Sequence, residues 1–413
     1  MNRKIYLDSA ATTYVSGEVM QTMLPYFTNE FGNAASVHSY GREAEKAVSK
    51  ARTQIADAIG ANPNEIYFTC SATEANNWIL NGVVRNSKSK RVIVSSIEHP
   101  SIMETCKQLE KDGYKVEQIE VDEQGIVIIS DLVAKLSKPA ALVSVMAANN
   151  EIGTIQFINT VSQLCKKYGV PFHTDAVQAI GAIHINVKEM DIDALSLSSH
   201  KVYGPKGVGA LYIRNGMKVD KFIHGGHQER NRRGGTQNIP AIVGFGHAIE
   251  LTLRDSKTNN ARMRTLRDYF INQVELRFKN VKLNGHRTQR LVNNINFSFQ
   301  GCEGESLLMM LDMAGIAVST GSACSSGTLT RSHVLDAVGV PADMNQSSIR
   351  FSLSRSTTRE DIDYTLIELE KIVRKLRKMT ALKSRAVLRR QYVQRSNYAK
   401  ICKTEKRGNY PRL

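Results

Sequence analysis

The chain has 413 residues, of which 42% are hydrophobic and 23% charged, the composition of an ordinary soluble globular protein with length enough for two domains. No apolar run reaches the about 20 residues that a membrane helix needs, so we expect no membrane span and a cytoplasmic location. The six cysteines form no CxxC pair and show no regular spacing, which indicates neither a zinc site nor a disulfide framework.

Strand-like and helical patterns alternate along the chain. Strands are predicted at residues 66–68, 91–95, 141–145, 171–173, 194–197 and 209–213. This alternation predicts a mostly parallel sheet with helices on both faces. A long helical pattern at 242–278 then leads into a smaller domain, which contains a strand at 292–299 and ends in the helix after Thr358.

The first candidate ligand site follows the strand at 66–68. Small residues at 69–73 open a helical stretch that runs through Leu80. Free backbone N–H groups at a helix start bind anions, so Ala72 and Thr73 are candidates to hold a phosphate. The alternative is an ordinary capped helix without a ligand.

Asp175 ends the short apolar strand near 171–173, where α/β folds place their ligands. A carboxylate at this point could pair with the ring nitrogen of pyridoxal phosphate and keep that nitrogen protonated. Gln178 could donate to the ring hydroxyl group. The alternative is that Asp175 caps the next helix.

Lys201 follows the apolar residues 194–197, in the run Ser198-Ser199-His200-Lys201. A buried lysine loses its charge readily and becomes a nucleophile, which suits it to hold an aldehyde cofactor as a Schiff base. The alternative is a solvated lysine at a strand end.

Cys324 lies among small residues in Gly321-Ser322-Ala323-Cys324-Ser325. This setting is typical of an exposed, reactive thiol and not of a packed one. The alternative is an incidental surface cysteine. Cys302 lies in another loop and ranks behind Cys324.

Taken together, these motifs resemble those of the pyridoxal-phosphate cysteine desulfurases, the group that includes the NifS and IscS enzymes. The resemblance covers residues 5 to about 364. Further matching segments are Ile5–Thr13, Phe31–Asn33, Glu98–Ser101, Asn149–Gly153, Gly225–Thr236, Glu303–Ser306 and Ser347–Phe351.

The resemblance implies an α/β fold, fold type I of the pyridoxal-phosphate enzymes. The large cofactor-binding domain, with a mostly parallel sheet of the seven-stranded type, would span residues 15–260. Residues 1–14 and 261–378 would form a smaller α+β domain that carries the mobile Cys324 loop. Residues 379–413 would form a basic C-terminal tail.

Roles for individual residues also come from the resemblance. Lys201, His99 and Cys324 would be catalytic, His99 lying over the ring and taking part in proton transfer. The cofactor would be bound by Ala72, Thr73, Asn150, Asp175, Gln178, Ser198, His200 and Lys201, with Thr236 contributed by the neighbouring subunit of a homodimer. Asn33, Asn150 and Arg350 would bind the substrate carboxylate. Arg355 lies close to Arg350 in the sequence, and the residues alone do not show which of the two binds the carboxylate. The resemblance favours Arg350.

The implied reaction converts L-cysteine to L-alanine and leaves a persulfide on Cys324. An acceptor protein such as an iron–sulfur scaffold would then take the sulfur. No metal site is expected in the chain itself, and any cluster or metal would meet Cys324 on a partner. The His227–Arg230 motif is closer to the nitrogen-fixation branch, and the chain lacks the C-terminal ending with which housekeeping desulfurases dock their scaffold.

Other functions stay open. A selenocysteine lyase or another β-eliminating enzyme could use the same cofactor site. A class-V aminotransferase would have no use for Cys324. An inactive adaptor could keep the fold and bind a partner through its tail.

The tail is the most basic part of the chain. Residues 371–413 contain fifteen Lys and Arg against the single acid Glu405, which is +14 of the total charge of +16. The interpretation is either a solvated helix end with a disordered tail, or an electrostatic contact with an acidic partner, a nucleic acid or an anionic surface. Only three tyrosines interrupt the basic residues, so specific nucleic-acid recognition is not expected.

Overall fold

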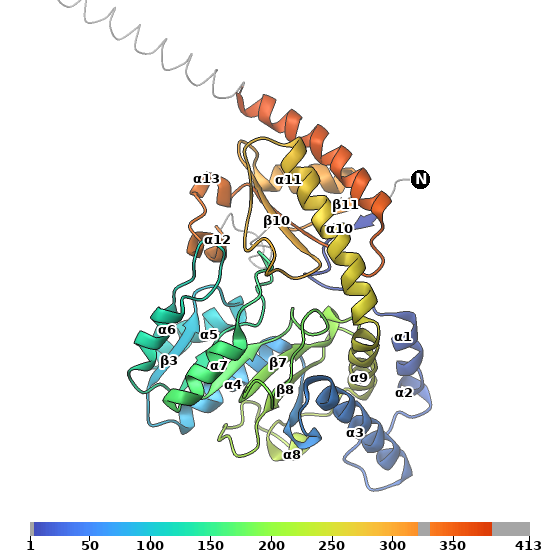
Figure 1. The fold of residues 1–413 in the computed structure, drawn as a ribbon. Coiled ribbons are helices and arrows are strands. Elements are labelled where there is room, and N and C mark those ends of the chain that lie inside the picture. The colour runs from blue at the N-terminus through green and yellow to red at the C-terminus, as the bar shows by residue number, and fades with distance from the viewer. Residues whose placement is uncertain (1–3, 321–330, 382–413) are drawn as a thin grey trace, which may run out of the picture.

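The computed structural model describes residues 4–320 and 331–381. Cys324 and the chain beyond residue 381, which includes most of the basic tail, lie outside the described residues. Figure 1 shows two bodies, with the larger sheet in the lower one and a small sheet around β10 in the upper one. Helix α10 runs from one body to the other.

The strands are β1 Ile5–Tyr6, β2 Ile66–Thr69, β3 Arg91–Ser95, β4 Lys115–Ile119, β5 Leu142–Ser144, β6 Phe172–Asp175, β7 Ala194–Ser198, β8 Gly209–Ile213, β9 Val281–Leu283, β10 Asn294–Phe299, β11 Ile316–Ala317 and β12 Ser348–Ser352. The helices are α1 Gly17–Met23, α2 Pro25–Thr28, α3 Ser39–Ile59, α4 Ala72–Asn86, α5 Pro100–Lys111, α6 Ile129–Leu136, α7 Ile158–Tyr168, α8 Gln228–Asn231, α9 Ile239–Arg254, α10 Ser256–Arg277, α11 Gly304–Met313, α12 His333–Ala337 and α13 Ala342–Asn345. A further helix covers residues 359–381.

The large sheet has seven strands in the order β2-β8-β7-β6-β5-β3-β4. Neighbours from β7 to β4 are parallel, and β8 is antiparallel to both β2 and β7. The prediction of a mostly parallel sheet is therefore confirmed. The predicted strands 91–95 and 209–213 match β3 and β8, whereas β6 extends two residues beyond the predicted 171–173 and ends on Asp175 itself.

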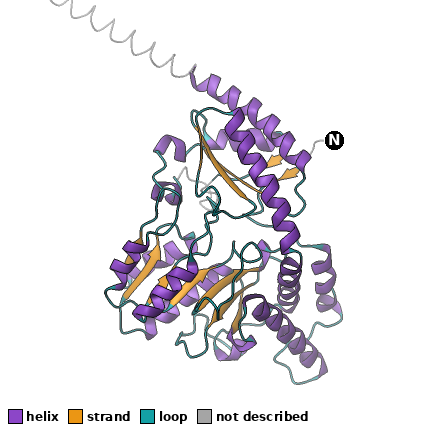
Figure 2. Cartoon of the chain, viewed as in Figure 1, coloured by secondary structure: helices purple, strands orange, loops and turns teal. Residues whose placement is uncertain are grey.

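Helices cover both faces of this sheet (Figure 2) because successive side chains of a strand point to opposite faces. In β3, Val92 and Val94 pack into a core with α4 and α5. Ile93, between them, packs into the other core, which contains residues of α3, α7 and α9. Both faces are apolar, so the strands read as nearly continuous hydrophobic runs.

The upper body has its own core around the antiparallel sheet β12-β10-β9. Ile5 and Leu7 at the start of the chain belong to this core. The long helical pattern at 242–278 resolves into α9 and α10, which are separated at Asp255. Residues of α12 pack into the large core, although they follow the small-domain strands in sequence. The boundaries 15–260 and 261–378 stay a proposal.

Within residues 4–320 and 331–381, the structure contains no helix that is both long and apolar enough to cross a membrane.

Candidate active site

A cavity of about 280 Å³ opens at the carboxyl ends of the central parallel strands, the position where such sheets bind ligands. Ten of the predicted site residues line it: Ala72, Thr73, His99, Asn150, Asp175, Gln178, Ser198, His200, Lys201 and Arg350. Residues that lie as far apart as 72 and 350 in sequence therefore meet at one site.

Lys201 ends a short 3-10 helix, Ser199–Lys201, which follows β7 directly. Its ammonium Nζ donates to the carbonyl oxygens of Ala10 and Ala11, at 2.6 Å and 2.7 Å. Gln178 Nε2 also donates to the Ala10 carbonyl, at 3.0 Å. The amino-terminal segment thus forms one wall of the cavity and holds the lysine side chain in it, which sequence reasoning did not foresee.

Asp175 is the last residue of β6 and is buried. One carboxylate oxygen accepts from Asn76 Nδ2 at 2.8 Å, and the other accepts from the backbone N–H of Val177 at 3.0 Å. Turn residues follow Asp175, so the alternative that it caps a helix is wrong. These two donors fix the carboxylate where it faces the cavity.

Ala72 and Thr73, the first residues of α4, also line the cavity. Ser71 caps the helix, and its side-chain oxygen accepts from the backbone N–H of Glu74 at 3.2 Å. Gly209 of β8 packs behind this helix start, because a Cβ there would lie 2.7 Å from the Ser71 carbonyl carbon and 2.9 Å from Ala72 N. The backbone donors of the helix start are thus placed for an anion.

Ser198 and His200 flank Lys201 in the same wall. His200 Nδ1 lies 3.1 Å from Thr12 Oγ1. Burial lowers the pKa of His200 to about 4, so the imidazole is neutral at physiological pH. A neutral ring keeps one N–H donor for a ligand without adding a charge.

His99 precedes α5 and caps it. Its Nδ1 accepts from the backbone N–H of Ser101 at 3.1 Å and lies 2.8 Å from Ser101 Oγ, which fixes the plane of the ring. Burial lowers the pKa of His99, Asp175 opposes this shift, and the nearby Lys201 adds to it. The lowered pKa favours the neutral form of the ring, which has one nitrogen able to accept a proton.

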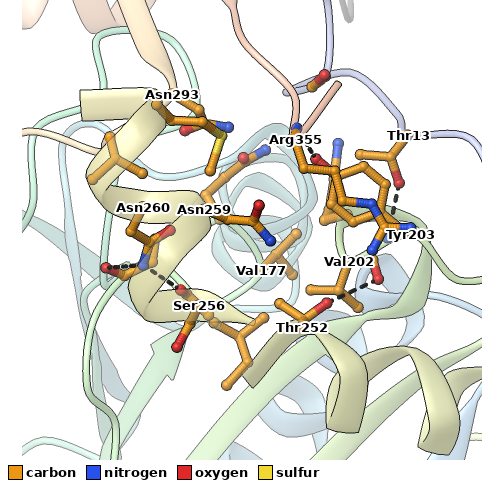
Figure 3. A pocket seen from close by; sticks show the side chains of 18 residues that line it. Thr13, Val177, Val202, Tyr203, Thr252, Ser256, Asn259, Asn260, Asn293 and Arg355 are labelled. Atoms are coloured by element: carbon orange, nitrogen blue, oxygen red, sulfur yellow. Dashed lines mark hydrogen bonds between the residues drawn. The ribbon is translucent and has the colours of Figure 1, made fainter. Parts of the chain in front are cut away.

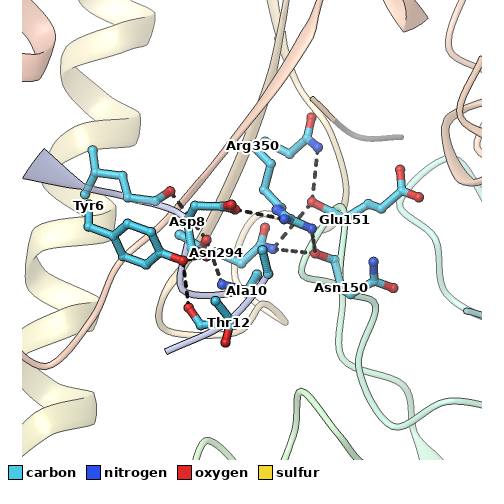
Figure 4. A network of polar contacts seen from close by, with 12 residues as sticks. Tyr6, Asp8, Ala10, Thr12, Asn150, Glu151, Asn294 and Arg350 are labelled. Atoms are coloured by element: carbon cyan, nitrogen blue, oxygen red, sulfur yellow. Dashed lines mark hydrogen bonds and ion pairs between the residues drawn. The ribbon is translucent and has the colours of Figure 1, made fainter. Parts of the chain in front are cut away.

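Arg350 lies in β12, and only 4% of it is exposed. Its Nη1 donates to the carbonyl oxygen of Asn150 at 3.1 Å, and its Nη2 pairs with Asp8 Oδ1 at 3.0 Å (Figure 4). Its Nε is buried and has no hydrogen-bond partner among the described residues. An unpaired buried donor is costly, and a bound carboxylate would satisfy it.

Arg355 lines a smaller cavity of about 70 Å³, together with Thr13, Asn259 and Asn293 (Figure 3). Lys201 and Gln178 line both cavities. Its guanidinium carbon lies 4.1 Å from the ring centroid of Tyr203, a cation–π contact. Arg350, and not Arg355, lines the 280 Å³ cavity together with the other nine predicted residues.

Two predicted residues do not line the Lys201 cavity of the single chain. Asn33 is exposed, and its side-chain oxygen accepts from Ala35 N at 2.9 Å. Thr236 is exposed and lines another cavity beside Cys70 and Arg233. Their expected roles stay predictions.

Cys302, the second cysteine that the sequence offered as a reactive thiol, is only 7% exposed and packs in the core of the upper body. Burial raises the pKa of its thiol. It is therefore unsuited to carry sulfur. Within the part of the chain that the structure describes, no cluster of His, Cys, Asp and Glu could hold a metal ion.

Comparison with known proteins identifies the class of this site. Residues 5–365 match the family model of the class-V aminotransferases. The cysteine desulfurase IscS of Dictyoglomus turgidum is 50% identical over 385 residues, covering 93% of this chain and 98% of that protein. The chain belongs to the class-V aminotransferase family and, within it, to the NifS/IscS group of cysteine desulfurases.

Solved structures agree. A NifS-like protein superposes with a TM-score of 0.84 at 37% identity, covering 90% of this chain and 99% of that one. The structure of SspA in complex with cysteine superposes with a TM-score of 0.76 at 33% identity, covering 86% and 100%. The predicted fold type I and the dependence on pyridoxal phosphate are confirmed.

The cavity fits this cofactor. It presents a lysine amine, a buried carboxylate at a strand end, a helix start with free N–H groups and a neutral imidazole. These are the groups that an aldehyde, a pyridine nitrogen and a phosphate require.

Proposed function

We propose that this enzyme, a cysteine desulfurase, uses Lys201, His99, Asp175 and Arg350 to take sulfur from L-cysteine and release L-alanine. The observation that carries the proposal is that these four side chains line one cavity. Their types match the requirements of the reaction: a nucleophilic amine, a proton carrier, an acid for the ring nitrogen and a carboxylate-binding cation. The similarity to desulfurases over most of the chain supports the same activity.

Several residues that line the cavity would hold the cofactor. Lys201 binds its aldehyde, Asp175 its ring nitrogen and Gln178 its ring hydroxyl. Its phosphate is held by Ala72 and Thr73 at the start of α4, and by Ser198 and His200 beside Lys201. Bound pyridoxal phosphate supplies an electron sink for the electron pair that remains when a proton leaves the α-carbon of cysteine.

The side chains of the cavity do the remaining work of the first step. Arg350 and Asn150 would orient the substrate through its carboxylate, and Asn33 would bind the same group. The amine of Lys201 would accept the α-proton of the substrate. His99, which Ser101 holds in place, would exchange further protons within the cavity.

Cys324 takes the sulfur in the second step. Its thiolate attacks the substrate sulfur, an S–S bond forms, and the Cβ–S bond breaks with its electrons passing to Cβ. Protonation of that carbon completes alanine, and Cys324 keeps the sulfur as a persulfide. No outside oxidant is needed, because the substrate carbon is reduced as the two sulfurs become partly oxidised.

The partners follow from this chemistry. We infer a homodimer in which Thr236 reaches the phosphate of the neighbouring subunit. In support of this, Thr236 is exposed and does not line the 280 Å³ cavity of its own chain. The persulfide passes to an acceptor protein, such as an iron–sulfur scaffold, in the cytoplasm.

A selenocysteine lyase is the second candidate, since the cavity would also accept selenocysteine. The discriminating property is whether turnover depends on Cys324, because elimination of selenium needs no attacking thiol. An inactive adaptor would have no reason to keep Lys201, His99 and Asp175 around one cavity.

The test combines the visible absorbance of the purified protein with alanine and sulfide release from L-cysteine. Wild type should be yellow and release both products. Cys324→Ala should be yellow but inactive with cysteine, and Lys201→Ala should lose both the lysine-linked absorbance and the activity. Cys302→Ala is the matched control and should keep turnover. A wild type that cannot be reconstituted with pyridoxal phosphate would overturn the proposal.

A further inference from the structure

A carboxylate stands beside the place where the cofactor phosphate would bind. Glu74 is the third residue of α4, directly after Ala72 and Thr73, and it is only 7% exposed. One of its oxygens, Oε2, accepts from the backbone N–H of Cys70 at 2.7 Å. The positive end of the helix dipole stabilises a negative charge in the first turn, just as it stabilises a bound anion. The carboxylate and the bound anion, however, repel each other.

Arg233 neutralises this carboxylate. Its Nε donates to Glu74 Oε1 at 2.8 Å and its Nη2 to Oε2 at 3.0 Å, the parallel two-bond geometry of a strong ion pair. The side chains are only 17% and 5% exposed, so water screens the pair weakly. Burial opposes ionisation of Glu74, but the hydrogen bonds from Arg233 and Cys70 outweigh it and lower its pKa.

The segment that delivers Arg233 is held in a strained shape. Glu229, Arg230 and Asn231 all have left-handed backbone angles, with φ of 47°, 55° and 63°. Three such residues in succession are costly for L-amino acids and persist only where contacts enforce them.

Those contacts are present. The carboxylate of Glu229 is bound by Arg52 through two hydrogen bonds of 2.7 Å and 3.0 Å, and by Gln237 at 2.6 Å. Arg233 therefore sits between residues that are fixed on both sides of it. Its guanidinium is placed against Glu74 before any ligand arrives.

We propose that Arg233 is a positioning residue for cofactor binding, which acts through Glu74: by neutralising and orienting that carboxylate, it keeps the start of α4 attractive to the cofactor phosphate. Arg233 does not line the Lys201 cavity and touches neither the substrate nor the reacting atoms. The inference rests on the proposed place of the phosphate at Ala72 and Thr73.

The test compares Arg233→Gln, Glu74→Gln and the double variant, each purified as holoenzyme and then stripped of cofactor. The affinities for pyridoxal phosphate and for pyridoxal, which lacks the phosphate, are measured by absorbance titration. Arg233→Gln should weaken pyridoxal phosphate about tenfold and leave pyridoxal within about twofold, because only the phosphate meets the unpaired charge. Removal of that charge in the double variant should restore wild-type affinity to within about threefold.

Other outcomes separate the possible failures. Equal loss for both ligands, or no recovery in the double variant, would show that the ion pair matters only for the fold. Arg233→Lys keeps the positive charge at this position and serves as a conservative control. The melting temperatures of all variants show whether any of them has a folding defect. If Thr73→Asp, which places a negative charge at the start of α4, leaves the affinity ratio of the two ligands unchanged, the proposed phosphate site itself is wrong. If Thr73→Asp lowers the affinity for pyridoxal phosphate relative to that for pyridoxal but Arg233→Gln does not, only the present inference fails.

Discussion

Ser319 and Arg350 exchange two backbone hydrogen bonds, of 3.2 Å from Ser319 N and 2.7 Å from Arg350 N. Ser319 comes shortly before residues 321–330, among which Cys324 lies, and Ser332 comes shortly after them. Ser332 Oγ donates to Glu151 Oε2 at 2.6 Å, and Glu151 adjoins Asn150, whose carbonyl accepts from Arg350. The described residues on either side of 321–330 are therefore both linked to Arg350, Ser319 directly and Ser332 through Glu151 and its neighbour Asn150.

Replacement of Arg350 should mainly weaken substrate binding. Arg350→Gln should raise the KM for L-cysteine about 100-fold, because a charge-assisted pair of hydrogen bonds contributes up to about 3 kcal/mol. Steady-state kinetics would measure this. Arg355→Gln is the control and should leave KM within about threefold, since Arg355 does not line the cavity that contains Arg350. Equal KM values in the two variants would contradict the assignment.

Replacement of His99 should affect turnover and not cofactor content. His99→Gln should lower kcat about 100-fold or more while the visible absorbance remains, as expected on loss of a general acid–base group. His184→Gln, at a histidine whose side chain is 73% exposed, should behave as wild type. A His99 variant with normal kcat would remove this residue from the mechanism.

Glu98 should make the folded protein less stable at alkaline pH. Burial raises the pKa of its carboxyl to about 8, against the hydrogen bonds from Ser95 and Met146 that lower it. The folded state therefore binds the proton more tightly than the unfolded state, and stability falls as pH rises from about 4.5 to about 8.

Between about pH 4.5 and pH 8 the free energy of unfolding should fall less in Glu98→Gln than in wild type. The difference between the two falls should be up to about a few kcal/mol. Urea unfolding at a series of pH values measures the difference. Glu104→Gln changes a carboxylate that is 67% exposed, and it should follow the wild-type profile. Parallel profiles for wild type and Glu98→Gln would refute the prediction.

A methyl group at Gly209 should disturb the cofactor site from behind. Its Cβ would meet Ser71, Leu197 and Ala72 backbone atoms at 2.7 Å to 2.9 Å, and backbone cannot move aside cheaply. Gly209→Ala should cost about 1–3 kcal/mol of stability and weaken pyridoxal phosphate, measured by urea unfolding and absorbance titration. Gly17→Ala, where nothing lies within 4 Å, should do neither.

Much of the large sheet could be predicted because its strands are short, apolar and local in sequence. β3 and β8 were predicted with their observed limits. The antiparallel direction of β8 was not predicted, because the hydrophobic pattern of a buried strand is the same in either direction.

The strand pattern placed Asp175 and Lys201 at the carboxyl ends of neighbouring strands, where parallel sheets bind ligands, and the resemblance added His99, Asn150 and Arg350, which line the same cavity. Their supporting contacts could not be predicted. Asn76 donates to Asp175 across 99 residues, and Asp8 pairs with Arg350 across 342. Nothing local marks either residue, because an asparagine inside a helix and an aspartate near a chain start have many ordinary uses.

The place of the amino-terminal segment decides when the cavity can form. Ala10 and Ala11 receive the amine of Lys201, and Asp8 pairs with Arg350. At about 5–20 residues per second, a ribosome needs roughly 20 to 70 seconds to reach residue 350 after it has made the first ten. During this interval Asp8 has been made but Arg350, its partner in the folded protein, has not. The carboxylate-binding part of the cavity can therefore form only long after the amino-terminal segment and the proposed cofactor-binding residues have been made.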